Sequence, residues 1–304
     1  MDGVGPRIVI AGGSGFIGSA LAKSLENSGI EVVLLSRKAA PAADRRSVPW
    51  DGETLGGWAD VLDGAKCVVN LSGTSVSARK TDANRRQIIA SRVRTTELIG
   101  DAVRCCARPP STWINASATG FYGSRGDEAL TETSRSGNDF LADVCKRWEG
   151  AVWQAETPGV RKCVLRSGIV LGREGGAYPL LLRLVKAFVG GAAGSGRQWM
   201  PWIHLTDQVN AVRWLIDSDL DGAFNVCSPN PVRNSEFMRS LRTSQNRPFA
   251  PPAPAPMLRL LSQFLPTDLT LALDSCRAMP KKLVEAGFEF EFQELQAALA
   301  GLKL

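Results

Sequence analysis

Residues 7–18 read RIVIAGGSGFIG, an apolar run that stops at a glycine-rich loop and continues into a helical pattern. Apolar side chains at Ile17, Leu21 and Leu25 have helical spacing, which predicts a helix that ends near residue 26. The glycines fit either G-x-x-G-x-x-G or G-x-G-x-x-G, and both let backbone N–H groups approach a pyrophosphate at the positive end of the helix. Strand, loop and helix in this order predict a dinucleotide-binding site. The loop residues expected to contact the dinucleotide are Gly12, Gly13, Ser14, Gly15, Phe16, Ile17 and Gly18.

The rest of the N-terminal half alternates apolar runs with helical patterns. The expected strands lie at 31–35, 67–71, 113–117 and 162–166, and the expected helices at about 84–106 and 139–156. This alternation predicts right-handed βαβ crossovers and an α/β fold, a Rossmann doubly wound parallel sheet with a smaller C-terminal substrate lobe. We expect a dinucleotide-binding domain over 1–172, with 203–228 returning to it, and a substrate lobe with a C-terminal segment over 173–304.

Composition excludes several classes of protein. With 44% hydrophobic residues and a net charge of +6, the chain can bury a large core and carries no charged tail. Seven cysteines without a C-x-x-C pair, and a single histidine, argue against a zinc site and a disulfide framework and favour the cytoplasm. The most apolar later stretch, 177–193, is interrupted by Arg183 and Lys186, so it does not predict a membrane span. We expect a small-molecule substrate and neither a membrane nor a nucleic-acid partner, and leave a homodimer open.

The end of the second expected strand indicates which dinucleotide binds. An NAD site usually has Asp or Glu about twenty residues after the glycine loop, where it bonds the ribose hydroxyls. This chain has Ser36, Arg37 and Lys38 there instead. Two cations and a hydroxyl suit the extra 2′-phosphate, which predicts NADP(H). The alternative is a solvated basic turn.

Further motifs follow the glycine loop in order along nearly the whole chain. They are NLSG at 70–73, SRVRTT at 91–96, SATGFYG at 117–123, LRSGIVLG at 165–172, GSGRQ at 194–198, PWIH at 201–204, SPNPVRN at 228–234 and the segment 280–288. With these motifs the chain resembles an extended short-chain dehydrogenase/reductase, in particular the atypical epimerase-like subgroup often labelled cell-division-inhibitor-like. The resemblance implies a Rossmann domain and a C-terminal substrate lobe.

The resemblance also implies the positions of further site residues. Cofactor contacts are implied for Leu71, Ser72, Gly73, Gln87, Arg92 and Val170, and a place in the substrate lobe for Arg197, Trp202 and His204. Arg92 has an alternative interpretation as one surface charge in a basic helix. His204 is either a structural hydrogen-bonding residue or a catalytic one.

Members of this superfamily transfer a hydride with a Ser or Thr, a Tyr, and a Lys four residues after the Tyr. Ser117 and Thr119 fit the hydroxyl position, and Lys146 fits the lysine. The tyrosine position is then Ala142, which cannot donate a proton. Tyr122 is a substitute donor or a packed loop aromatic.

Two functions therefore stand side by side. One is an NADP-dependent epimerase or oxidoreductase with an altered proton donor, acting on a small carbonyl or nucleotide-sugar-like compound. The other is a non-catalytic NADPH-binding sensor or regulatory protein. The glycine loop is common to both, so it does not separate them.

Overall fold

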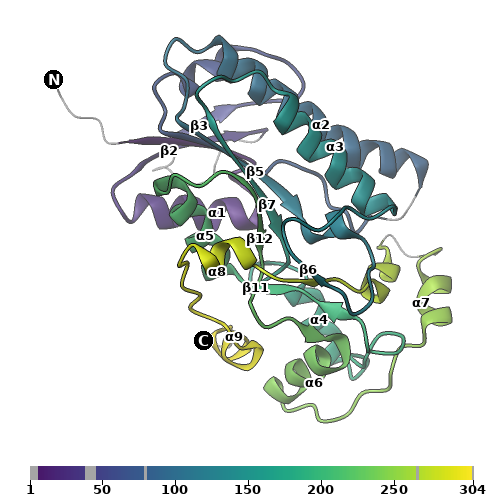
Figure 1. The fold of residues 1–304 in the computed structure, drawn as a ribbon. Coiled ribbons are helices and arrows are strands. Elements are labelled where there is room, and N and C mark those ends of the chain that lie inside the picture. Colours follow the sequence, from purple (N-terminus) through teal and green to yellow (C-terminus); the bar gives the residue numbers. More distant parts are fainter. Residues whose placement is uncertain (1–5, 38–45, 79–80, 265–266, 303–304) are drawn as a thin grey trace.

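A seven-stranded parallel sheet forms the centre of the computed structural model, which describes residues 6–37, 46–78, 81–264 and 267–302 (Figure 1). The strand order is β12 (Gly222–Val226), β7 (Arg161–Ser167), β5 (Thr112–Ala118), β4 (Cys67–Asn70), β1 (Arg7–Ala11), β2 (Glu31–Ser36) and β3 (Arg46–Pro49). The order reverses between β1 and β4, which is where open α/β sheets bind ligands at the carboxyl ends of their strands. The Rossmann prediction is confirmed.

Two helical layers cover the sheet because its strands are apolar on both faces. Ile8 and Ile10 of β1 pack in the core beneath α1 (Phe16–Glu26) and α5 (Leu205–Asp217). Val9 of the same strand points the other way, into the core beneath α2 (Asp82–Cys105), α3 (Phe140–Gln154) and η1 (Gly57–Leu62). Figure 1 shows α2 and α3 together on one side of the sheet, and α1 with α5 on the other.

Helix starts are fixed by side-chain caps where the sequence supplies them. The Thr81 hydroxyl accepts a hydrogen bond from the backbone N–H of Asn84 at the start of α2. The Asp139 carboxylate accepts from the N–H of Ala142 at 2.9 Å and begins α3. The helices predicted at 84–106 and 139–156 are thus present, each shifted by one or two residues.

A smaller lobe lies beyond the carboxyl edge of the sheet. Its helices are α4 (Tyr178–Lys186), α6 (Asn234–Ser244), α7 (Ala255–Leu261) and α9 (Leu295–Gly301), with η3 (Leu269–Leu273). Its short strands pair as β11 (Trp202–His204) with β8 (Ile169–Gly172) and β9 (Gly175–Gly176), and β10 (Trp199–Met200) with β13 (Val232–Arg233). A further pair joins β14 (Arg277–Ala278) to β6 (Ala129–Leu130), so the lobe is tied to the loop that follows β5 and η2 (Thr119–Tyr122).

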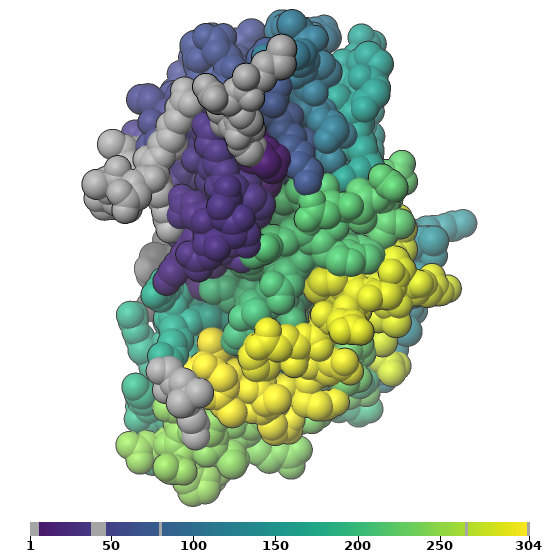
Figure 2. All heavy atoms as spheres, turned by 90° about the vertical axis from the view of Figure 1, so that its left-hand side faces the viewer, coloured from purple at the N-terminus to yellow at the C-terminus, as the bar shows by residue number. Residues whose placement is uncertain are grey.

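The C-terminal segment does not stay within that lobe. Leu283 of α8 (Lys281–Glu285), Phe288 and Phe290 join the core of the sheet beside α1 and α5. The Asp207 carboxylate in α5 accepts hydrogen bonds from the backbone N–H groups of 291 and 292. Figure 2 shows α1, the α5 region and this yellow C-terminal segment side by side on one surface. Residues 281–292 thus link the two parts of the molecule.

Two outer strands have no counterpart in the sequence prediction. β3 is four residues long, and β12 is five residues long. The described part of the chain contains no helix long and apolar enough to cross a membrane.

Candidate functional site

The glycine loop between β1 and α1 has a geometry that only glycine permits at two positions. Gly12 has a φ of +75°, and a side chain at Gly18 would lie 2.6 Å from the Gly12 carbonyl oxygen. The N–H of Gly15 donates to the same carbonyl, and Gly15 is the N-cap of α1. Ser14 and Gly15 are exposed at the loop tip. The backbone N–H groups of the α1 N-terminus are therefore open to an anionic ligand.

Two of the predicted loop contacts have packing roles. The Phe16 ring fills the space above Gly172, Gly175 and Gly176, where added side chains would lie 2.5–3.1 Å from it. Ile17 packs against the core of the sheet. Because both side chains have structural partners, only their backbone groups remain for a ligand.

The end of β2 lies beside the loop tip. The Ser36 hydroxyl donates a hydrogen bond to the Ser14 hydroxyl at 3.2 Å, so the predicted 2′-phosphate position meets the glycine loop. Arg37 follows and is exposed. Lys38 lies outside the described residues.

The loop after β4 forms the other side of the cleft. Gly12 approaches Leu71 and Ser72 so closely that an added side chain would lie 3.0 Å from the Leu71 carbonyl carbon and oxygen. The buried Asn70 amide donates to Asn115 at 2.8 Å, and its oxygen accepts from the N–H of Ser72. These bonds hold the loop that includes Gly73 against the glycine loop.

Arg92 of α2 is buried behind this loop. Its exposed fraction is 8%, and its guanidinium lies 4.9 Å from the centre of the Trp148 ring. A side chain added at Gly73 would lie 3.0 Å from the guanidinium carbon. Its one hydrogen bond within the described chain goes to the Ile88 carbonyl, and no described carboxylate forms an ion pair with it. Burial lowers the pKa of Arg92, which is the signature of a cation without a counter-ion. Gln87, predicted to act beside it, is exposed.

A buried polar network lies at the carboxyl ends of β5, β7 and β12. Ser117, Arg166 and Asn225 are register partners on these strands. The Ser117 hydroxyl donates to Glu149 of α3 at 2.7 Å, and Glu149 forms an ion pair with Arg166 at 2.8 Å. Burial alone would lower the pKa of Arg166, but the Glu149 carboxylate raises it. The predicted catalytic serine is thus bonded to a buried carboxylate, which the sequence analysis did not single out.

Tyr122 belongs to the same network. Its hydroxyl donates to Asn225 at 2.6 Å and accepts from Arg166 at 3.0 Å, and its ring is fully buried. Burial raises the pKa of this phenol. These contacts favour the packed-aromatic interpretation of Tyr122. Thr119 is also buried, and its carbonyl accepts from the Cys276 thiol.

The face of α3 that meets the end of β5 differs from the prediction by one residue. Lys146 is exposed to solvent, and Ala142 is fully buried. Leu141 and Cys145, also four residues apart, are the pair at the strand end: both lie near Gly120, and the Cys145 thiol donates to the Ala118 carbonyl at 3.7 Å. Burial raises the pKa of Cys145 to about 11, so this thiol is neutral at pH 7.

The predicted lobe residues are largely structural. Trp202 is fully buried and donates to the Asn230 carbonyl at 3.1 Å. His204 is the N-cap of α5, where Nδ1 accepts from the N–H of Thr206, and its ring stacks on Phe292 at 4.0 Å. Burial lowers the pKa of His204 to about 4. Val170 is buried in β8.

The lobe nevertheless brings a group of cations to the loop that leaves β5. The Trp199 ring lies between two guanidiniums, Arg233 at 4.3 Å and Arg277 at 4.7 Å from its centre. Asp127 of the loop accepts from Arg233 and from the Trp199 indole, both at 2.9 Å. These bonds lower the pKa of Asp127, and the nearby charge of the predicted lobe residue Arg197 adds to the effect. The buried Nε of Arg277 has no hydrogen-bond partner among the described residues.

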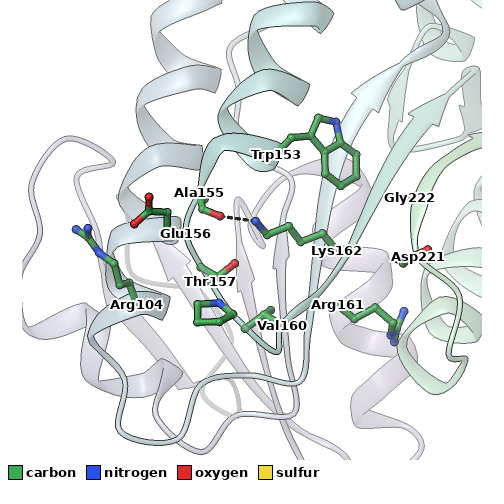
Figure 3. A pocket seen from close by; sticks show the side chains of 11 residues that line it. Arg104, Trp153, Ala155, Glu156, Thr157, Val160, Arg161, Lys162, Asp221 and Gly222 are labelled. Atoms are coloured by element: carbon green, nitrogen blue, oxygen red, sulfur yellow. Dashed lines mark hydrogen bonds between the residues drawn. The ribbon is translucent and has the colours of Figure 1, made fainter.

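An open pocket of about 790 Å³ lies at the opposite, amino edge of the sheet (Figure 3). It is lined by the start of β7 and the end of α3, and Figure 3 shows Lys162 directed at the Ala155 carbonyl. Arg161 donates to the carbonyls of 215 and 220. Arg161 and Lys162 are therefore already bonded to backbone carbonyls and have a structural role in this pocket. The carboxyl edge of the sheet remains the candidate functional site.

Comparison with known proteins gives consistent matches over nearly the whole chain. The NAD dependent epimerase/dehydratase family matches residues 8–227, and the domain of unknown function DUF1731 matches 253–302. The "Epimerase family protein SDR39U1 homolog, chloroplastic" of Arabidopsis thaliana is 33% identical, covering 97% of this chain and 86% of its own. Human epimerase family protein SDR39U1, crystallised with NADPH, has a TM-score of 0.86 at 28% identity and covers 97% of this chain and 98% of its own. A nucleoside-diphosphate sugar epimerase from Corynebacterium glutamicum has a TM-score of 0.78 at 36% identity, covering 98% of this chain and 58% of its own.

Proposed function

The chain belongs to the NAD dependent epimerase/dehydratase family, and from this premise we propose that it binds NADP(H) and acts on a small anionic carbonyl compound of the nucleotide-sugar type. The cofactor would lie over the glycine loop, with its 2′-phosphate at Ser36 and Arg37. When bound, it supplies the hydride. The NADPH complex of the human relative supports the same choice of cofactor.

The buried charge of Arg92 is the observation that carries this proposal. A guanidinium that is out of water without a carboxylate is costly, because its desolvation is not offset by an ion pair. Arg92 lies directly behind Gly73, in the loop that approaches Gly12. A cofactor phosphate bound at this loop would provide the missing negative charge. The site is thus preorganised for an anionic dinucleotide.

The cations around Trp199 support the substrate class. Arg233 and Arg277 lie over the Trp199 ring, Arg197 and Arg233 lie near the Asp127 carboxylate, and this cluster is anchored on the loop that leaves the carboxyl end of β5. Guanidiniums bind phosphates through paired hydrogen bonds. A nucleoside diphosphate carries two phosphates that such a cluster can bind. The name of the Corynebacterium glutamicum relative points to the same class.

The proton-transfer groups of this site depart from the usual set. Ser117 is bonded to Glu149, and the two positions beside the strand end hold Leu141 and Cys145. Leu141 has no proton to donate, and burial raises the pKa of the Cys145 thiol to about 11. We therefore propose that water or a substrate hydroxyl carries the proton and that turnover is slow. Losing a positioned general acid typically lowers a rate by about 10²–10⁴-fold.

The same departure favours a second candidate function, an NADPH-binding sensor without turnover. Leu141 and Cys145 close the place where a proton donor would stand, while the glycine loop and Arg92 are intact. Such a protein would report cofactor occupancy to a partner.

Two measurements on the purified chain test these proposals. Calorimetric titration should show tighter binding of NADPH than of NADH, and the reverse order would contradict the cofactor proposal. Titration with UDP should show binding that is weakened in Arg233→Gln and Arg277→Gln but kept in the exposed control Arg239→Gln. UDP binding that is absent, or equal in all three variants, would contradict the substrate class.

Loss of NADPH absorbance with 4-keto UDP-sugars and simple ketones, whose carbonyl groups can accept the hydride, then separates the two functions. Slow consumption with a 4-keto UDP-sugar supports the enzyme. Stable NADPH binding with no consumption across the panel supports the sensor.

A further inference from the structure

The positive charge of this chain is concentrated in two segments of the lobe. Residues 175–206 and 237–267 together contain seven Lys or Arg and no Asp or Glu. Since the whole chain carries a net charge of +6, the remainder has a net charge of −1. The basic character of the protein therefore belongs to these two segments alone.

Most of the large exposed apolar side chains lie in the same two segments. The most exposed are Leu180, Phe188, Val189, Phe249, Met257, Leu260 and Phe264, with exposed fractions between 44% and 74%. Met257, Leu260, Leu261 and Phe264 follow one another at i, i+3, i+4 and i+7, a helical stripe that normally faces a core. Here the stripe on α7 and the turn after it faces solvent. A partner that buries this apolar stripe must therefore come from outside the described chain.

Backbone and side-chain contacts hold the two segments together. Gly194 donates to the Ala253 carbonyl and Ala253 donates to the Ala192 carbonyl, both at 2.8 Å. The Arg247 guanidinium lies 4.6 Å from the centre of the Phe188 ring. We call the combined surface of residues 180–189 and 247–264 the basic apolar face.

Phe188 adds an independent observation. It follows α4 with a φ of +62°, and its N–H and that of Val189 close the helix end on the carbonyls of 185 and 184. Glycine usually occupies this position, because a bulky side chain is strained there. The ring of this strained residue is half exposed and contacts the Arg247 guanidinium instead of packing in the core, and strained positions concentrate at functional surfaces.

We propose that the basic apolar face binds the surface of a lipid bilayer that contains anionic lipids. Apolar side chains on short helices and turns insert at the boundary between headgroups and acyl chains, while surrounding Lys and Arg attract the negative surface. Arg183, Lys186 and Arg259 are exposed beside the apolar residues. The expectation of no membrane partner rested on the absence of a spanning segment, whereas this attachment needs none.

The charge distribution argues against other occupants. A second copy docked through the same face would bring two sets of cations together, and neither segment supplies a carboxylate to pair with them. Single-stranded nucleic acid binds through cations and stacked aromatic rings. The face has three exposed phenylalanines, but it also exposes the aliphatic side chains of Val189, Met257, Leu260 and Leu261, which base stacking leaves in water and insertion into a bilayer buries.

Sedimentation of the full chain with lipid vesicles tests this proposal. Vesicles of phosphatidylcholine alone are compared with vesicles in which about a third of the lipid is phosphatidylserine. We expect binding to the anionic vesicles, and its loss at about 1 M salt, where the Debye length is about 3 Å. Phe249→Glu/Phe264→Glu should weaken binding at least about tenfold. Leu55→Glu/Val284→Glu, at apolar positions that are about half exposed and lie outside the face, should bind normally.

Charge reversal tests the second component of the face. Arg183→Glu/Arg259→Glu should weaken binding by at least about twentyfold, since each cation near an anionic surface contributes about fivefold. Equal binding to both vesicle types, no binding, or equal loss in the control variant would overturn the proposal. So would a vesicle-free oligomer that Phe249→Glu/Phe264→Glu dissociates, because the face would then belong to a second copy. All variants should keep NADPH binding, so this test is independent of the proposed function.

Discussion

Replacing Arg92 by Met should change stability and cofactor affinity in opposite directions. Met keeps the aliphatic volume against Trp148 but removes a buried cation that has no described carboxylate partner. The free energy of unfolding without cofactor should therefore stay the same or rise, because replacing buried charge by an apolar side chain is often neutral or stabilising. NADPH affinity should fall about ten- to a hundredfold, since a charge-assisted hydrogen bond contributes about 1.5–3 kcal/mol.

Thermal or urea unfolding with and without NADPH measures both effects. At an NADPH concentration about 100 times the native Kd, the native protein should gain about 2.7 kcal/mol of stability. A variant that binds about thirtyfold more weakly should gain only about 0.9 kcal/mol at the same concentration. Arg86→Met, on an exposed position of the same helix, is the matched control and should behave as the native protein. Unchanged NADPH affinity in Arg92→Met, or a clear loss of stability without cofactor, would refute the reasoning.

Four further outcomes follow from the site. Arg37→Asp should weaken NADPH binding about ten- to a hundredfold and leave NADH binding nearly unchanged in calorimetry. An equal loss of affinity for both cofactors would contradict the placement of the 2′-phosphate at Arg37. Gly15→Val should abolish NADPH binding while circular dichroism stays native, because the exposed loop tip can hold the side chain only where the pyrophosphate would lie. Leu141→Tyr/Cys145→Lys should gain reductase activity with simple ketones, whereas no gain in a folded, NADPH-binding variant would contradict their placement beside the hydride. Because burial lowers the folded-state pKa of His204 to about 4, below its unfolded value, the unfolded chain binds more protons between pH 6.5 and 4. As the pH is lowered from 6.5 to 4, the free energy of unfolding should therefore fall. Urea titrations at each pH should show a smaller fall for His204→Asn, which keeps an N-cap.

The central part of the fold could be predicted because its signals are local. The run at 7–11, the glycines and the apolar residues of α1 are neighbours in the sequence, and each has the residue type that its own backbone conformation requires. The short strands β3 and β12 could not be predicted in the same way. β12 is stabilised by pairing with β7, which is distant in the sequence. β3 is stabilised by pairing with β2, from which a long connection separates it.

The site was predictable only where it coincides with local motifs. Gly12, Gly18 and Ser36 lie where the glycine loop and the second strand predict them. The Glu149–Arg166 ion pair and the contacts of Arg233 and Arg277 with Trp199 were not identified, because their partners come from separate elements. An arginine inside an apolar strand was the one sequence signal for the buried pair.

The sequence by itself determined the sheet, the glycine loop and the preference for a dinucleotide, since these depend on residue order and on glycine conformation. Only the tertiary structure decided that Cys145 rather than Lys146 meets the end of β5, and that Arg92 is buried without an ion pair to any described carboxylate. A helix has 3.6 residues per turn, so a shift of one residue turns a side chain by about 100° around the axis. Which face of α3 points inward is fixed by packing against α2 and the sheet. The spacing of residues within the helix does not determine how the helix is rotated about its axis.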